Sequence, residues 1–308
     1  MRIAMMGSGG VGGFFGGRLA QAGCDVTFIA RGAHLEAMRA RGLRIASTGH
    51  PEIHLPKVNA TDDPSKVGAV DLVILSVKLW DTESAAKAIA PMVAPHTGVL
   101  SLQNGVVKDD ILRRFFPASQ VMGGICYVAT HIAEPGVIQQ TGTMQRIVVG
   151  EYDGSASKRA TALRDALAGT GVQAELSTDI RRSLWEKYVF LVGLSGSTTT
   201  IRRPLGVVRA NERSRAFLAD LMQETVDVGR AHGVDLPADY AKQRMPFADS
   251  LPHDMTSSMH HDLERGNRLE VEWLSGGVVT LGEQKGVATP RNRAVWDILA
   301  PHAMGRTE

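Results

Sequence analysis

The sequence has little of what several other protein classes depend on. Its 308 residues include two cysteines, Cys24 and Cys126, and no apolar run approaches the roughly 18 residues that a membrane span needs. Two cysteines provide no disulfide framework, which favours a reducing compartment. The first residues already predict a buried strand, which leaves no room for a targeting peptide. We therefore expect a cytoplasmic protein without a membrane anchor.

An excess of charge of one sign is also missing. The 34 basic and 32 acidic side chains leave a formal net charge of +2. Proteins that bind nucleic acid or membrane surfaces usually carry a marked basic patch or excess. The partners we expect are therefore small molecules, and we predict no metal site. A chain of this length is long enough for two domains with separate cores.

Glycine, by contrast, is plentiful, and its most informative use is near the start of the chain. A short apolar strand at residues 3–6 leads into a glycine-rich loop, and an apolar-periodic helix then runs to Ala22. The loop consists of Gly7, Ser8, Gly9, Gly10, Val11 and Gly12. Gly7 permits a tight turn, Gly9 lets the backbone approach a pyrophosphate, and Gly12 lets helix and strand pack closely. This order predicts a dinucleotide site at the helix N-terminus, and a chance glycine-rich turn is the alternative.

The residue after the next predicted strand, 26–30, bears on which dinucleotide is bound. NAD sites usually place an acidic residue there to hold the ribose 2′-hydroxyl. This chain has Arg31 instead, with no acid until Glu36. Because a guanidinium can bind phosphate through two parallel hydrogen bonds, we predict NADPH. A solvated surface arginine is the alternative.

Two more polar residues follow buried strands. Lys78 comes after the apolar run 72–77, and Asn104 comes shortly after 99–102. In an open parallel sheet, ligands bind beyond the carboxyl ends of the strands, so both residues join Arg31 as candidate site residues. The alternatives are that Lys78 is simply solvated and that Asn104 belongs to a favoured Asn-Gly turn.

The pattern of strands and helices changes in the second half of the chain. The strands expected before the change are 121–128, 136–141, 146–150 and 173–176, with a helix at 158–170. We expect 136–141 and 146–150 to form an antiparallel hairpin that turns at Gly142 and Thr143. Beyond Ser177 only long helical segments follow, so the predicted domains are 1–177 and 178–308.

Lys187 is the leading catalytic candidate in the second domain. It lies in a predicted helix at about 179–199, at the start of a run that is apolar on all sides and should therefore be buried. Burial disfavours the charged form and lowers the pKa of a lysine, which would make Lys187 a usable proton donor near neutral pH. The alternative is a lysine whose stem reaches water.

A second candidate segment is 255–284. Arg268 and Glu272 are four residues apart, which predicts an exposed ion pair. Glu270 falls on an apolar helical face, and Ser258, twelve residues earlier, should lie near the same face. The alternatives are a carboxylate satisfied within the core and a serine bonded to its local backbone.

These motifs together resemble the ketopantoate reductase (2-dehydropantoate 2-reductase) family across nearly the whole chain. The residues that carry the resemblance are the loop 7–12, Arg31, Lys78, Asn104, Trp185-Glu186-Lys187, Ser257-Ser258-Met259 and Leu269-Glu270-Val271-Glu272. The resemblance implies an α/β Rossmann-type, doubly wound sheet followed by an all-α domain like that of phosphogluconate dehydrogenase. It also implies NADPH-dependent reduction of a 2-oxo acid in the pantothenate pathway, and it suggests a homodimer.

The resemblance assigns roles residue by residue. Lys187 would be the general acid that protonates the C2 oxygen of the substrate, and Glu270 would contact the cofactor side and help to fix Lys187. Asn104 would contact both cofactor and substrate. The remaining implied contacts are Lys78 and Ala129 for the cofactor, and Ser195 and Ser258 for the substrate.

The chain departs from the family in the substrate pocket. Where the family has amides, this chain has Leu191, Ser195, Leu205 and Met255. Losing amides removes hydrogen bonds that would recognise the hydroxyl and carboxylate of 2-dehydropantoate. Residues that could replace them are Thr198, Thr199, Arg202, Arg203 and Asp262. The alternatives are therefore a related enzyme for a less polar 2-oxo acid, or a non-catalytic protein that senses NADPH.

Overall fold

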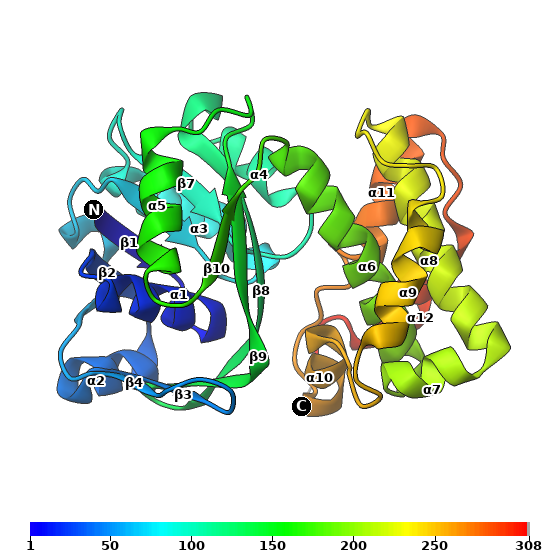
Figure 1. The fold of residues 1–308 in the computed structure, drawn as a ribbon, viewed down its shortest axis with the longest axis horizontal. Helices are drawn as coiled ribbons and strands as arrows, with labels where there is room; N and C mark the ends of the chain where they lie inside the picture. Colours follow the sequence, from blue (N-terminus) through cyan, green and yellow to red (C-terminus); the bar gives the residue numbers. More distant parts are fainter. Residues whose placement is uncertain (307–308) are drawn as a thin grey trace. The chain divides into compact units, whose positions relative to one another are not determined.

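The computed structural model describes residues 1–306 of the chain, which divides into two compact units (Figure 1). Unit 1 comprises Met1–Asn104 and Lys108–Ile180. Unit 2 comprises Gly105–Val107 and the described residues from Arg181 onward. The chain therefore leaves unit 1 briefly after Asn104 and finally after Ile180.

Unit 1 is built on one 10-stranded sheet. Its strands are β1 (Arg2–Met6), β2 (Asp25–Ile29), β3 (Leu43–Ser47), β4 (Ile53–Leu55), β5 (Asn59–Thr61), β6 (Leu72–Leu75), β7 (Gly98–Ser101), β8 (Val121–Glu134), β9 (Val137–Gly150) and β10 (Gln173–Leu176). The order is β4-β3-β9-β8-β7-β6-β1-β2-β5, with β10 also beside β9. β1 pairs in parallel with β2 on one side and β6 on the other. The strand order reverses beside β1, which is where such sheets bind ligands.

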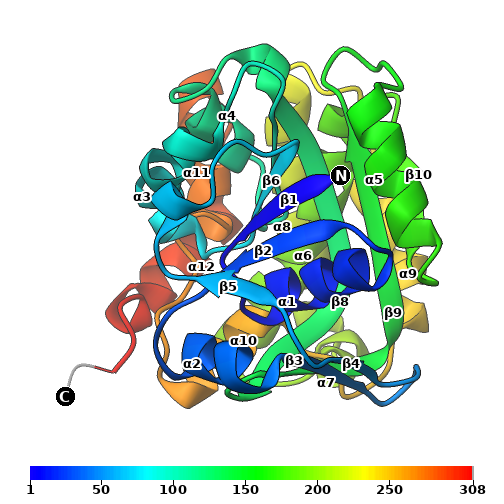
Figure 2. The same ribbon diagram turned by 90° about the vertical axis from the view of Figure 1, so that its left-hand side faces the viewer.

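Helices cover both faces of this sheet (Figure 2). They are α1 (Gly10–Gln21), α2 (Gly32–Arg41), α3 (Thr82–Ile89), α4 (Lys108–Arg113) and α5 (Lys158–Ala168), with 3₁₀ turns that include η1 (Pro64–Lys66) and η2 (Leu79–Asp81). Alternate residues of β1 enter different cores: Ile3 and Met5 join Phe14 of α1, whereas Ala4 joins Ala86 of α3. The continuous apolar strands of the sequence follow from this two-sided burial.

The regular secondary structure of unit 2, within its described residues, consists of helices joined by loops. Its helices are α6 (Ile180–Ile201), α7 (Leu205–Ala210), α8 (Glu212–Ala231), α9 (Tyr240–Ser250), α10 (Ser258–Arg265), α11 (Ser275–Lys285) and α12 (Pro290–Leu299). Tyr188, Val189 and Val192 of α6 pack in one core with Leu221 of α8 and Val278 of α11. The fold class expected from the sequence, a doubly wound α/β domain followed by an all-α domain, is confirmed.

The predicted hairpin at Gly142 and Thr143 is wrong. Residues 137–150 form the single strand β9, and the turn to β8 lies at Pro135–Gly136. In the register of the two strands, Ala129 pairs with Thr141 and Val128 with Gln145, so residues 142–144 bulge from the ladder. Gly142 adopts a positive φ of +72° there. The glycine signal was therefore real, but it marks a bulge rather than a turn.

The predicted common helical face of Ser258 and Glu270 is also wrong. α10 ends after Arg265, because Gly266 caps it in the left-handed conformation. Helical structure resumes only at Ser275, so Glu270 lies in the connecting segment. Glu272, in the same segment, accepts a 2.9 Å hydrogen bond from the indole nitrogen of Trp296. Spacing counted along one continuous helix therefore does not apply across residues 266–274.

Candidate functional site

The glycine loop between β1 and α1 has the geometry that its spacing predicts. Gly7 has a φ of +91°, and a Cβ there would lie 2.7 Å from Val77 Cγ1. A Cβ on Gly12 would collide with the Gly7 carbonyl oxygen, so the helix can approach the turn only with glycine at that position. A Cβ on Gly9 would meet nothing within 4 Å. Gly7 and Gly12 are thus required by packing, whereas Gly9 leaves open space for a ligand.

Neighbouring elements hold this loop in place. The backbone N–H and the hydroxyl of Ser8 both donate to the Ile29 carbonyl, at 3.0 and 3.1 Å. The Ser76 hydroxyl donates to the Gly7 carbonyl, and a Cβ on Gly10 would lie 2.5 Å from the Thr130 carbonyl oxygen. The side chain of Ser8 therefore faces the protein. The loop can still offer backbone amides at the N-terminus of α1, where a helix has unpaired donors.

Arg31 is exposed and lies in the short connection between β2 and α2, directly before the first residue of α2. Its side chain forms no hydrogen bond or ion pair with any residue in 1–306. Two acidic residues, Asp62 and Asp63, follow the neighbouring strand β5 rather than β2, and β5 was not predicted because it is short. The Ala30 N–H donates to the Thr61 carbonyl and fixes this neighbourhood.

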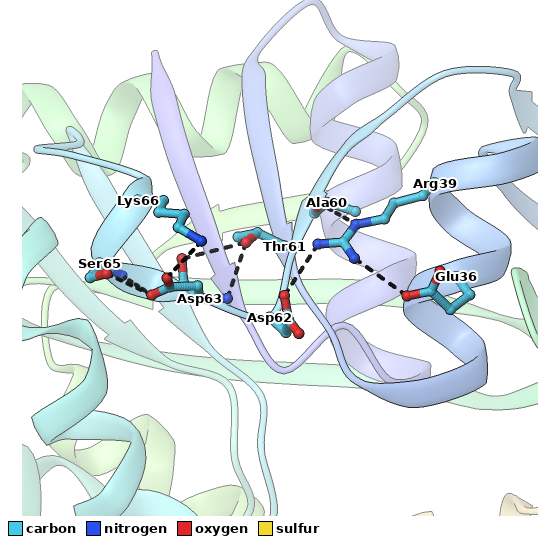
Figure 3. A network of polar contacts seen from close by, with 8 residues as sticks. All are labelled: Glu36, Arg39, Ala60, Thr61, Asp62, Asp63, Ser65 and Lys66. Carbon is cyan, nitrogen blue, oxygen red and sulfur yellow. Dashed lines mark hydrogen bonds and ion pairs between the residues drawn. The ribbon is translucent and has the colours of Figure 1, made fainter.

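Both carboxylates already have partners (Figure 3). Asp62 forms a 3.2 Å ion pair with Arg39, which also contacts Glu36. Asp63 accepts from Ser65 and pairs with Lys66 at 3.2 Å, and these hydrogen bonds hold the pKa of Asp63 below its usual value. Both carboxylates are therefore paired within their own surroundings, and neither is bonded to Arg31.

Lys78, Asn104 and Ala129 lie at other strands of unit 1. Lys78 precedes η2, and its ammonium lies 5.7 Å from the ring centroid of Trp80. Asn104 is half-buried beyond β7, and Ala129 is exposed on β8. Gln103 links the first two, because its amide nitrogen donates to the Lys78 carbonyl at 3.3 Å and to the Thr82 hydroxyl at 2.8 Å. This link joins residues 25 positions apart and has no local sequence signal.

Lys187 is half-buried on α6 and is followed by the fully buried Tyr188. The Tyr188 hydroxyl lies 2.9 and 2.7 Å from the carbonyl oxygens of Trp273 and Leu274. Burial raises the pKa of Tyr188, so its hydroxyl stays protonated and donates. These contacts tie α6, next to Lys187, to the segment that contains the buried Glu270, which is 6% exposed. The two candidate catalytic residues of unit 2 thus come from elements that are bonded to each other.

The candidate substrate residues of unit 2 differ in exposure. Ser258 is exposed at the first position of α10, whereas Ser257 is buried and caps this helix by accepting from the His260 N–H at 3.1 Å. Ser195 is fully buried, and its hydroxyl has no hydrogen-bond partner within the described chain. Of these serines, only Ser258 is presented at the surface of the unit.

The residues at the positions of the family's amides, and those expected to replace the amides, also differ in exposure. Thr198 and Thr199 are fully buried, with their hydroxyls 3.4 and 3.5 Å from that of Ser257. Leu205 is fully buried too, because its backbone N–H is fixed to the Met255 carbonyl and its side chain belongs to the core of unit 2. Leu191 and Met255 are half-buried, and Arg202 and Arg203 are exposed.

Across residues 1–306, no group of three or more His, Cys, Asp or Glu side chains is arranged to hold a metal ion. Within the same range, none of the helices is both long and apolar enough to cross a membrane.

Comparison with known proteins decides the family. Residues 3–154 match the family model described as ketopantoate reductase PanE/ApbA, and residues 179–303 match the model of its C-terminal part. The chain belongs to the ketopantoate reductase family. A 2-dehydropantoate 2-reductase from Archaeoglobus fulgidus is 32% identical, covering 97% of this chain and 96% of that protein. One from Mesorhizobium japonicum is 31% identical over 99% of both chains.

Solved structures agree with this assignment. A PanE/ApbA family ketopantoate reductase from Ralstonia eutropha JMP134 is 36% identical, with a TM-score of 0.88 over 98% of both chains. A D-mandelate dehydrogenase, solved with NADH and anilino(oxo)acetate, has a TM-score of 0.87 over 98% of both chains at 23% identity, which shows a shared fold alone. The resemblance seen in the sequence is confirmed: this ketopantoate reductase family member is an oxidoreductase that acts on a 2-oxo acid.

Proposed function

We propose that this protein is an NADPH-dependent reductase that converts 2-dehydropantoate to pantoate in pantothenate biosynthesis. One observation supports it above the others. The full-length family match coincides with a glycine loop that is open only at Gly9 and with an Arg31 that has no acidic partner among the described residues. An NAD site would instead have an acidic side chain available for the ribose 2′-hydroxyl.

The residues of unit 1 fit a dinucleotide. Loop 7–12 would bind the pyrophosphate through backbone amides, and Arg31 would bind the 2′-phosphate. Lys78 and Asn104, which follow β6 and β7, and Ala129, which lies within β8 beside the bulge of β9, would contact the rest of the cofactor, with Asn104 also contacting the substrate. When bound, NADPH supplies the hydride that reduces the C2 carbonyl.

The residues of unit 2 would supply the acid chemistry. Reduction of a carbonyl builds negative charge on its oxygen, so a positioned ammonium that donates a proton to that oxygen lowers the barrier. Lys187 would donate this proton and later recover one from solvent. Glu270 would hold the Lys187 ammonium in place and contact the cofactor. Ser258 would bind the substrate carboxylate, and Ser195 would reach the substrate only if the interior around it opened.

A second candidate substrate is favoured by the half-buried Leu191 and Met255. These apolar side chains stand where the family has amides, so a 2-oxo acid less polar than 2-dehydropantoate would lose fewer hydrogen bonds here. A third interpretation is a protein that senses NADPH without turnover. It does not explain why a half-buried lysine and a buried glutamate are both present in unit 2.

The decisive experiment follows the loss of NADPH absorbance with 2-dehydropantoate and with larger and less polar 2-oxo acids. We expect the highest kcat/KM with 2-dehydropantoate, and a higher value for an apolar analogue would favour the second candidate. Tight NADPH binding without oxidation by any 2-oxo acid would favour the sensor. We further propose a cytoplasmic homodimer, which light scattering on the purified protein would test.

A further inference from the structure

His34, in the first turn of α2, joins three parts of unit 1. Its Nδ1 accepts a 3.1 Å hydrogen bond from the backbone N–H of Gly136, in the turn between β8 and β9. Its Nε2 lies 3.0 Å from the carbonyl oxygen of Ser8, in the glycine loop. A backbone N–H can only donate, so Nδ1 is unprotonated and Nε2 carries the hydrogen. The ring is therefore neutral and donates to Ser8.

This contact fixes the orientation of one peptide group in the loop. None of the peptide bonds within residues 1–306 is cis, so the Ser8 carbonyl and the Gly9 N–H lie in one plane and point in opposite directions. Because His34 holds the carbonyl toward α2, the Gly9 N–H points away from α2. Gly9 is also the glycine at which an added Cβ would meet no atom within 4 Å, and it directly precedes the first turn of α1.

We propose that His34 is a positioning residue of the cofactor site, which aims the Gly9 N–H at the pyrophosphate by holding the Ser8–Gly9 peptide plane. His34 acts through this peptide and does not contact the cofactor itself. The inference rests on the proposed NADPH site. It adds a residue outside the glycine motif, 26 positions from Ser8, on which binding of the dinucleotide depends.

The arrangement requires the neutral ring. Protonation would place a hydrogen on Nδ1 opposite the Gly136 N–H, and the two donors would repel. Burial holds the pKa of His34 below its ordinary value of 6.5, although its hydrogen bond to Ser8 acts the other way. The charged or titratable side chains of α2 and of the adjoining segments near the ring are exposed, and none bonds to it: Arg31, Glu36, Arg39, Arg41, Arg44, His131 and Glu134. Arg18 of α1 is buried and Arg146 of β9 is half-buried, and both bond to other residues. The arrangement is thus intact at neutral pH and is lost as the pH falls.

Titration of NADPH fluorescence with the full-length protein tests this inference. For His34→Ala we expect a Kd about 10-fold above that of the wild type, the effect of one lost hydrogen bond. In His34→Gln, the amide can accept from Gly136 and donate to Ser8, so affinity should be largely retained. Between pH 7 and pH 5.5 the Kd should rise more steeply for the wild type than for His34→Gln, because protonation of the 2′-phosphate of NADPH weakens binding to both proteins. His50→Ala is the control, because His50 also bonds a carbonyl, Thr143, but lies away from the loop.

Adenosine 2′-monophosphate separates positioning from general disruption of α2. It carries the 2′-phosphate without the pyrophosphate, so His34→Ala should bind it as well as the wild type does, and Arg31→Ala should not. Equal losses of NADPH and adenosine 2′-monophosphate in His34→Ala would overturn the inference, as would wild-type NADPH affinity in that variant. If the wild type itself failed to bind NADPH, the proposed cofactor would be wrong, and this inference with it.

Discussion

The Ser76 hydroxyl donates a 2.5 Å hydrogen bond to the Gly7 carbonyl oxygen, which joins the end of β6 to the turn after β1. A Cβ on Gly12 would collide with both of these oxygen atoms. For Gly12→Ala we therefore expect the free energy of unfolding to fall by about 1–3 kcal/mol, together with loss of NADPH affinity. Denaturant unfolding and fluorescence titration measure the two effects.

Gly9→Ala is the matched control for this prediction. A Cβ on residue 9 meets no atom within 4 Å and φ is −73°, so stability should change by less than about 0.5 kcal/mol. The methyl group would nevertheless occupy the side from which a pyrophosphate approaches, so NADPH affinity should still fall. Unchanged NADPH affinity in Gly9→Ala would contradict the assignment of this loop.

Arg31→Ala should discriminate between the two nicotinamide cofactors. Loss of a charge-assisted contact to the 2′-phosphate should weaken NADPH by about 10- to 100-fold and leave NADH nearly unchanged. Arg213→Ala removes the same charge from the first turn of α8, where the side chain is exposed, and should affect neither. Equal losses for NADPH and NADH in Arg31→Ala would show that Arg31 does not recognise the phosphate.

Lys187→Ala should lower kcat by about 10²-fold or more, because general acid catalysis contributes at this scale. NADPH affinity should stay within about a factor of two, since Lys187 is proposed to contact the substrate and not the cofactor. Lys187→Arg keeps the charge but does not release a proton near neutral pH, so it should be nearly as slow. Wild-type kcat in either variant would remove Lys187 from the mechanism, and Lys242→Ala, on the exposed side of α9, is the control.

Asp109→Asn should change how stability depends on pH. Asp109 is fully buried at the start of α4 and accepts a 2.7 Å hydrogen bond from Tyr152, and burial raises its pKa above 3.8. The folded protein therefore keeps this proton where the unfolded chain has lost it, so its stability falls as the pH rises through that range. Asparagine cannot ionise, so the variant lacks this loss of stability. The unfolding free energy of Asp109→Asn should therefore rise relative to that of the wild type between pH 4 and pH 8. A difference in unfolding free energy that did not depend on pH would contradict this prediction. Asp110→Asn, at an exposed position, is the control and should show little change in the pH dependence of stability.

The centre of the fold is predictable from sequence because its signals are local. A run such as Leu72–Leu75 is apolar throughout because helices cover both of its faces. β5 was not predicted, since Asn59–Thr61 is short and polar at the edge of the sheet. α4 was not predicted either, because it opens with Lys108 and Asp109, which are typical surface residues but are fully buried here. Lys108 donates to the carbonyls of Ser101 and Gly124, which only the tertiary structure brings together.

In the candidate site, too, features with local sequence signals could be predicted, whereas contacts between distant residues could not. The glycine loop could be predicted because its function depends on spacing within six residues. The contributions of His34 and Gln103 could not, because their partners lie far away in sequence: Gly136 is 102 residues from His34, and Lys78 is 25 residues from Gln103. The buried member of the serine pair, Ser257, is a helix cap, and only the position at which α10 begins distinguishes it from Ser258.

The edge of β9 has a consequence for synthesis of the chain. β9 pairs with β3 along residues 137–140 and with β10 along residues 146–149, both on the side away from β8. Translation at about 5–20 residues per second separates residue 47 from residue 137 by roughly 5–20 s. During that interval the nascent β3–β4 hairpin has left the ribosome before its second neighbour exists, and it presents an unpaired edge to other chains. Chaperone binding to nascent chains that end between these residues would be the cellular sign of this delay.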